Sequence, residues 1–218
     1  MLFHLRIILR NLRSNGIYSV INIGGLALGM AAAILILAWI YHEWSYDRFH
    51  AKEKQLHVVY MRTTLDGSVQ CMTSSPTPLG AALKENYPEI TGFARMANAD
   101  FHFANEETKL KIQTGYTDPD FLTMFDFPLL QGDRETALND PYSVVLTEKA
   151  AMRLFGQESP MGKTVLIDNQ YPVVIMGVMK DLPDNTLFHF EALMPVDFMK
   201  VRGAYNENWS SNTIATYV

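Results

Sequence analysis

A long stretch without charged residues constrains this sequence more than any other feature. Residues 14–42 contain no Lys, Arg, Asp or Glu, and residues 17–41 are mostly apolar, with Asn22 as the only strongly polar side chain. As a helix, those 25 residues would measure roughly 37 Å, against a bilayer hydrocarbon core of about 30 Å. Every proline occurs at Pro76 or later. The sequence therefore predicts a single transmembrane α-helix over residues 17–42.

A cleaved signal peptide is the main alternative for this stretch. Its apolar region would be about 7–15 residues long and would end at small residues. Ala31-Ala32-Ala33 offers small residues, but Ile34-Leu35-Ile36-Leu37 follows immediately, which favours burial over cleavage. Aromatic residues also gather where the stretch ends, as expected for the belt at a membrane–water interface. The predicted interfacial aromatics are Trp39, Tyr41, Trp44 and Tyr46.

Charge is distributed unevenly about the predicted span. Residues 1–42 contain Arg6, Arg10 and Arg13 and no acid, whereas the whole chain has a net charge of −5, so residues 43–218 carry −8. Basic residues beside a span are retained in the cytoplasm. We therefore expect a cytoplasmic N-terminus and an acidic domain on the far side of the membrane.

Residues 1–16 are predicted to form a cytoplasmic juxtamembrane helix. Arg6, Arg10 and Arg13 would share one helical stripe beside a stripe of leucines. Such a helix can lie along the inner leaflet with its arginines against anionic headgroups. A plain flank that stops translocation and binds nothing is equally consistent with the sequence.

Small residues recur at every fourth position inside the span. Gly25, Gly29 and Ala33 would lie on one helical face, where a GxxxG motif lets a second helix approach closely. These three are the predicted helix-packing residues. The alternative is that they reflect only the general abundance of Gly and Ala in membrane spans.

The sequence pattern of residues 43–218 predicts a folded domain with short strands, turns and brief helices. Asp66-Gly67 predicts a hairpin turn, and Thr77 and Thr147 are predicted helix N-caps. The strands lack a regular alternation with helices, which predicts an α+β fold of mixed, mostly antiparallel strands. Because residues 212–218 read as the start of a strand, we expect this domain to be truncated at its C-terminal end.

Few residues suggest chemistry. Cys71 is the only cysteine, which excludes an internal disulfide, and we expect its thiol to be buried. The histidines show no metal-ligand spacing, and the sequence predicts no catalytic, cofactor-binding or metal residues. The segment Gly156…Gly162-Lys163-Thr164 resembles a nucleotide-binding loop, but five residues separate its glycines where that loop has four. We expect a turn there, and the acidic domain argues against nucleic-acid binding.

Several segments together resemble the N-terminal part of FtsX-like, MacB-type ABC transporter permeases. The resemblance covers nearly the whole chain, in order and at plausible spacing, and implies a MacB-like periplasmic core domain after the first membrane helix. The segments are residues 5–12, 19–29, 45–50, 56–60, 87–90, 121–133, 144–150, 154–156 and 177–183.

The resemblance implies a non-enzymatic permease subunit in the bacterial inner (cytoplasmic) membrane. Such a subunit couples a separate cytoplasmic ABC ATPase, which would bind the ATP, to conformational change in a periplasmic domain, for export, efflux or mechanotransmission. Its other implied partners are a second permease subunit in a homo- or heterodimer, the lipid bilayer, and a periplasmic adaptor or substrate. Three later spans of the family are absent from this sequence. The alternative is a self-contained, single-span periplasmic adaptor or sensor module; a membrane-anchored hydrolase is disfavoured because no catalytic constellation is found.

Overall fold

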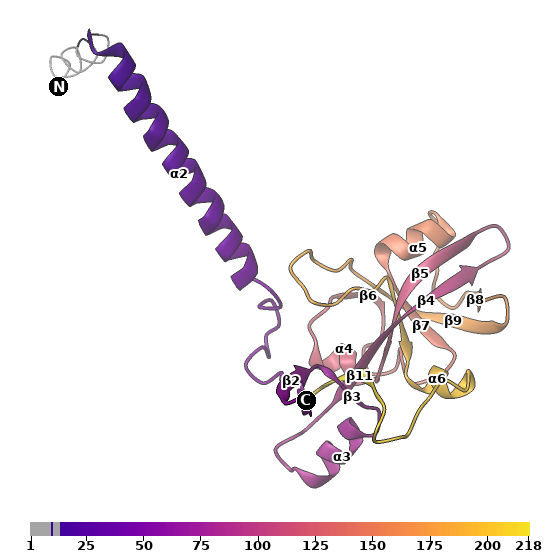
Figure 1. Ribbon diagram of the computed structural model, residues 1–218. Helices are drawn as coiled ribbons and strands as arrows, with labels where there is room; N and C mark the ends of the chain where they lie inside the picture. Colours follow the sequence, from indigo (N-terminus) through magenta and orange to yellow (C-terminus); the bar gives the residue numbers. More distant parts are fainter. Residues whose placement is uncertain (1–9, 11–13) are drawn as a thin grey trace. The chain divides into compact units, whose positions relative to one another are not determined.

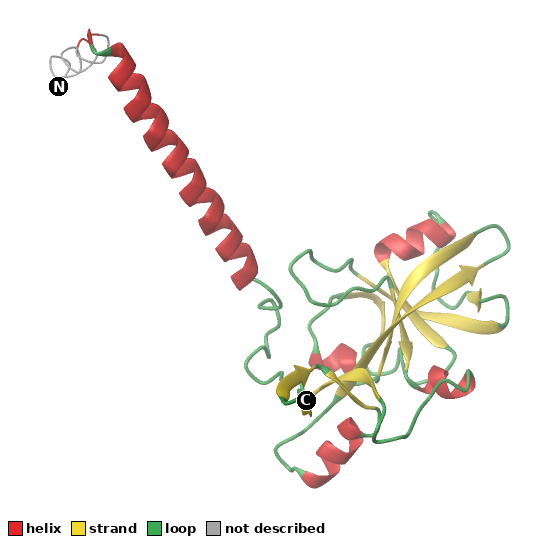
Figure 2. Cartoon of the chain, in the orientation of Figure 1, coloured by secondary structure: helices red, strands yellow, loops and turns green. Residues whose placement is uncertain are grey.

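The computed structural model describes residue 10 and residues 14–218, which divide into two compact units between Tyr46 and Asp47 (Figures 1 and 2). The first unit is dominated by helix α2 (Gly16–Trp44), whose 29 residues are long and apolar enough to cross a membrane. None of them is buried. The helix begins one residue before the predicted span and ends two residues after it. The predicted helix over residues 1–16 lies mostly outside the described residues, although Arg10 is helical and exposed.

The second unit is built on a nine-stranded sheet in the order β3-β11-β4-β5-β10-β7-β9-β6, with β8 pairing with both β4 and β9. Short helices pack around this sheet (Figure 2). The strands are β3 (Ser74–Pro76), β4 (Ala94–Ala104), β5 (Lys109–Thr117), β6 (Leu129–Gly132), β7 (Ser143–Thr147), β8 (Thr164–Ile167), β9 (Tyr171–Met179), β10 (Ala192–Pro195) and β11 (Asn212–Tyr217).

Most neighbouring strands are antiparallel, as predicted, but two pairs in the middle of the sheet are parallel. Strand β10 runs parallel to β5, and β7 runs parallel to β9. Strands β7 and β10 are buried along their whole length, as expected for strands covered on both faces. The mixed α+β class is confirmed.

The sheet separates two hydrophobic cores. Side chains of successive strand residues point to opposite faces, and along β7 Val144 and Leu146 enter one core while Val145 enters the other. The second core is rich in aromatic rings, and we call it the phenylalanine core. Its phenylalanines are Phe121, Phe125, Phe127, Phe188 and Phe190.

Four short helices accompany the sheet: α3 (Leu79–Asn86), α4 (Phe121–Met124), α5 (Glu148–Phe155) and α6 (Asp197–Val201). The predicted cap of α5 is confirmed, because Thr147 Oγ1 accepts a hydrogen bond from the Ala150 N–H at 3.3 Å. The predicted cap of α3 is wrong. The helix begins after Pro78 without a side-chain cap, and the Thr77 carbonyl instead accepts a hydrogen bond from Arg95.

A separate two-stranded hairpin, β1 (Met61–Leu65) and β2 (Ser68–Met72), precedes the sheet. Its turn is at Asp66-Gly67, where both residues have positive φ, and this prediction is confirmed. Cys71 lies on β2 and is exposed. The expected buried thiol is therefore wrong, because this hairpin forms a sheet of its own outside both cores.

Candidate functional site

Helix α2 carries two of the three sets of residues singled out from the sequence. A Cβ atom added at Gly25 or Gly29 would meet no atom within 4 Å, and Ala33 is exposed. Residues spaced by four lie on one helical face, so the three form a continuous strip of small side chains. Whether a second helix packs on this strip stays a prediction.

The predicted interfacial aromatics lie at the end of α2 and just after it. Trp39, Tyr41 and Trp44 are 64%, 76% and 71% exposed, whereas Tyr46 packs the edge of its ring against His42 with centroids 5.5 Å apart. Large apolar rings left exposed in this way are compatible with a lipid interface. In the arginine set, Arg6 and Arg13 lie outside the described residues.

The segment that follows the helix, residues 47–59, is attached to the sheet domain at three places, and we call it the entry segment. The first attachment is made by Asp47. Its carboxylate accepts hydrogen bonds from the Thr186 hydroxyl and from the Leu187 N–H, and its own N–H donates to the Asn185 carbonyl at 3.0 Å. Asp47 has φ +54, a backbone conformation that Asp tolerates better than most residues.

The second attachment joins the entry segment to the segment around α4. His50 Nδ1 accepts a hydrogen bond from the Asp126 N–H at 3.0 Å. The Asp126 carboxylate in turn accepts a hydrogen bond from the Ala51 N–H at 2.6 Å. Lys52 Nζ donates to the Thr123 carbonyl at 3.1 Å. These bonds join residues more than 70 positions apart in the sequence.

The third attachment is a short antiparallel pairing with the end of β11. The N–H of His57 donates to the Val218 carbonyl at 2.8 Å, and the Val218 N–H donates back to His57 at 2.9 Å. The bridge between Val58 and Tyr217 lies next to this pair, and the Val59 N–H donates to the Thr216 carbonyl on its other side at 2.9 Å. Residues 57–59, at the end of the entry segment, are therefore hydrogen-bonded to the end of β11 and to Val218.

Aromatic packing connects the last two attachments. The Tyr217 ring lies 5.5 Å from Phe125 and 5.4 Å from Phe188, and the His50 ring lies 5.2 Å from Phe125. Burial raises the pKa of Tyr217 to about 12, so its hydroxyl is uncharged at neutral pH. The entry segment is thus packed against the phenylalanine core through His50 and through the pairing partner of Val58, Tyr217.

Sequence reasoning missed these attachments. Residues 45–50 and 121–133 were both recognised as family-like segments, yet no local pattern indicates that they touch. The signals available in the sequence are the Asp47 and His50 side chains directly after the span and Asp126 between two phenylalanines.

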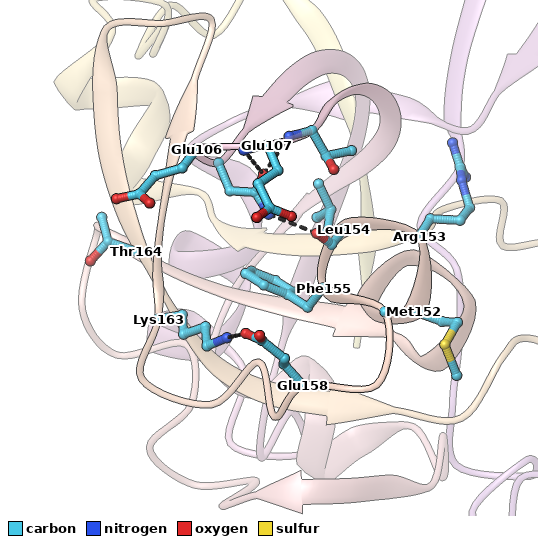
Figure 3. Close-up of a pocket in the computed structure, with 12 residues that line it drawn as sticks. Glu106, Glu107, Met152, Arg153, Leu154, Phe155, Glu158, Lys163 and Thr164 are labelled. Carbon is cyan, nitrogen blue, oxygen red and sulfur yellow. Dashed lines mark hydrogen bonds and ion pairs between the residues drawn. The ribbon is translucent and has the colours of Figure 1, made fainter.

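A surface cleft of about 620 Å³ opens elsewhere, between the turn after β4 and the end of α5 (Figure 3). Asn105 Nδ2 donates across it to the Leu154 carbonyl at 2.7 Å, and Lys163 forms an ion pair with Glu158. Gly162, just before Lys163, has φ +73 and leads into β8. The turn expected in place of a nucleotide-binding loop is confirmed. Over the described part of the chain, no group of three or more His, Cys, Asp or Glu side chains is placed to hold a metal ion.

Comparison with known families identifies this architecture. The family model described as the MacB-like periplasmic core domain matches residues 19–218. The chain belongs to this family. The resemblance found in the sequence is confirmed. The family and the N-terminal apolar helix together indicate a membrane-anchored chain with an extracytoplasmic domain of the ABC transporter permease family.

Solved structures share the fold at low sequence identity. A domain described as a permease domain from Porphyromonas gingivalis has 21% identity and a TM-score of 0.67, over 78% of this chain and 74% of that one. The extracellular domain of the ABC-type transporter YknZ from Gram-positive bacteria has 17% identity and a TM-score of 0.53, over 74% and 81%. The periplasmic region of MacB from Actinobacillus actinomycetemcomitans has 17% identity and a TM-score of 0.50, over 66% and 64%. No curated protein matches the sequence.

Proposed function

We propose that this MacB-like chain belongs to a permease subunit of the bacterial inner membrane, with α2 crossing the bilayer, the N-terminus in the cytoplasm and the sheet domain in the periplasm. In this proposal a separate cytoplasmic ABC ATPase binds and hydrolyses ATP, and the chain carries the resulting motion outward. The chain itself is not an enzyme. The single observation that supports this role best is the triple attachment of the entry segment.

The attachments determine how motion of α2 would reach the domain. Asp47 lies three residues after Trp44, so a displacement of the helix end must move Asp47 or stretch the short connection between them. Asp47 bonds the segment at 185–187, His50 and Ala51 bond Asp126, and His57 pairs with Val218. Motion of the helix would therefore displace these three parts of the sheet domain together.

The residues of the first unit have proposed roles in the membrane. Gly25, Gly29 and Ala33 provide the strip on which a helix of a second permease subunit packs, in a homo- or heterodimer. The aromatic set at the end of α2 anchors it at the outer interface. Arg6, Arg10 and Arg13 hold the juxtamembrane helix at the inner leaflet.

The transported molecule or signal would act on the periplasmic side. The domain offers a folded sheet with exposed loops, to which a periplasmic adaptor or a substrate binds in this proposal. Export and mechanotransmission use the same attachment of helix to domain and differ in what the domain releases or contacts.

The test measures ATP-dependent motion in the complete complex. We would purify the tagged permease from native membranes, reconstitute it in nanodiscs and measure vanadate-sensitive ATP hydrolysis. Spin labels placed at Lys111→Cys in a Cys71→Ser background would report the distance between two domains. Lys111 suits this use because it lies exposed on β5.

We expect an ABC ATPase to co-purify and the spin–spin distance to change between the ATP-bound and nucleotide-free complexes. Asp47→Ala should reduce that change while hydrolysis continues, and Asp100→Ala, at an exposed carboxylate, should leave it intact. A complex without ATPase activity, or a distance insensitive to nucleotide, contradicts the proposal and favours a self-contained adaptor or sensor.

A further inference from the structure

His50 is a buried histidine with an unusual hydrogen-bonding state. His50 is only 3% exposed. Among the described residues, its Nε2 is the one buried side-chain nitrogen or oxygen that has no hydrogen-bond partner. The ring lies against three phenylalanines rather than polar groups, with centroids 4.1–5.2 Å away. They are Phe49, Phe125 and Phe127.

The other ring nitrogen specifies which form of the imidazole fits this site. Nδ1 accepts a hydrogen bond from the Asp126 N–H at 3.0 Å, so Nδ1 carries a lone pair and the proton of the neutral ring is on Nε2. Protonation of His50 would place a second hydrogen on Nδ1, directly facing the N–H of Asp126. Two donors cannot share that position, so the imidazolium form is incompatible with the observed bond.

Charged groups lie on the segments that carry the two partners of this bond. The carboxylates of Asp47 and Asp126 attract an imidazolium, whereas Lys52, bonded to Thr123, and Arg134, whose guanidinium donates to the Phe127 carbonyl at 2.7 Å, add positive charge. Arg48 lies two residues earlier in the entry segment, and Tyr217 is uncharged. Burial lowers the pKa of His50 below 6.5, although Asp47 and Asp126 partly oppose this effect.

We propose that His50 is a proton-sensitive latch that holds the entry segment to the loop carrying Asp126 when the imidazole is neutral and releases it when the imidazole is protonated. In the released form, the imidazolium donates instead to the carboxylate of Asp47, and the Asp126 N–H is exposed to water. Acid would thus break the His50 hydrogen bond of the second attachment and weaken the hold of the Ala51 and Lys52 bonds beside it. The latch needs only the folded domain and does not rest on the proposed role in transport.

The direction of the pH effect follows from proton linkage. A histidine whose pKa is lower in the closed form than in the open form binds more protons in the open form. The closed form is therefore fully stabilised above about pH 6.5 and loses stability as the pH falls below that value. The loss continues until the pH reaches the lowered pKa of the closed form. Between pH 7.5 and 5.0 this linkage can shift the open-to-closed ratio by at most about 30-fold.

The experiment measures exchange of the Asp126 amide hydrogen by NMR in the full-length protein in nanodiscs, at pH 7.5 and 5.0. Each rate is divided by the intrinsic rate at that pH, so that only protection by structure is compared. We expect protection to fall by about 5- to 30-fold at pH 5.0 in the wild type. In His50→Asn, an amide oxygen near the position of Nδ1 accepts the same bond without titrating, and protection should not depend on pH.

The matched control is His189→Asn, because His189 is exposed. In this variant the Asp126 amide should lose protection at pH 5.0 as it does in the wild type. Equal protection of the wild type at the two pH values overturns the latch, as does the same acid loss in His50→Asn. Should that variant not fold, nitrogen chemical shifts of His50 in the wild type decide. The latch requires the Nε2–H tautomer at pH 7.5 and a titration midpoint equal to that of Asp126 exposure; a proton on Nδ1 at pH 7.5 contradicts it.

Discussion

Arg95 and Asp118 form the most buried ion pair among the described residues, with side chains 10% and 12% exposed. The guanidinium donates from Nη2 to Asp118 Oδ1 at 2.6 Å and from Nε to Oδ2 at 2.8 Å, and its Nη1 reaches Thr77 and Tyr205. Burial lowers the pKa of Arg95, but the bonds and charge of Asp118, assisted by Tyr205, outweigh burial and raise it. This arginine therefore joins β4 to the end of β5, the turn before α3 and the segment after α6.

Asp118→Asn should destabilise the domain by about 3 kcal/mol, because it leaves a buried guanidinium without a countercharge. The matched control is Asp100→Asn, whose partner Lys111 is 62% exposed; loss of that surface pair should cost less than about 1 kcal/mol. Urea unfolding of the detergent-solubilised protein, followed by circular dichroism, measures both. Equal effects of the two substitutions would show that Arg95 is not held as described.

Individual elements differ in how far the sequence predicts them. Helix α2 was predictable because a charge-free stretch of this length is stable as a helix in lipid without tertiary contacts. The cap at Thr147 and the turn at Asp66-Gly67 are local signals that depend on a few adjacent residues. The structure has a helix, a cap and a turn within two residues of each predicted position.

Elements held by distant partners were not predictable. Strand β3 is three residues long and exists because β11 pairs with it, and β10 lies between β5 and β7. Strand β4 runs unbroken from Ala94 to Ala104 because β11 pairs with its first residues and β5 pairs with it from Met96 onward. The attachments of the entry segment have the same origin, since their two sides lie far apart in the sequence.

The small-residue strip of α2 yields a prediction for helix association. Replacing both Gly25 and Gly29 with Ile should weaken self-association or pairing with a partner helix by at least about fivefold, because branched side chains would keep two backbones apart. Ala27→Ile with Ala31→Ile adds similar bulk on the opposite face and serves as the control. A membrane two-hybrid assay compares the variants. Unchanged association in the glycine variant would show that no helix packs on this strip.

At the scale of the whole molecule, the chain is continuous from α2 through the entry segment to the sheet. Asp47 and His50 attach the entry segment to the sheet domain, and His57 pairs with Val218. Residues 57–59 and 216–218 therefore lie side by side. A domain built in this way can respond to one membrane helix as a unit, provided that the helix and the domain occupy the bilayer and the periplasm respectively.

The single cysteine allows a direct measurement of that arrangement. Cys71 is exposed on β2, so a membrane-impermeant maleimide should label it in intact spheroplasts, to the same extent as after lysis. In the control, Cys71→Ser with Ser14→Cys, labelling should require lysis because residue 14 precedes the span. Labelling of Cys71 before lysis, together with protection of the cysteine at position 14, is the result that the account predicts. A Cys71 thiol that reacts only after lysis would contradict it.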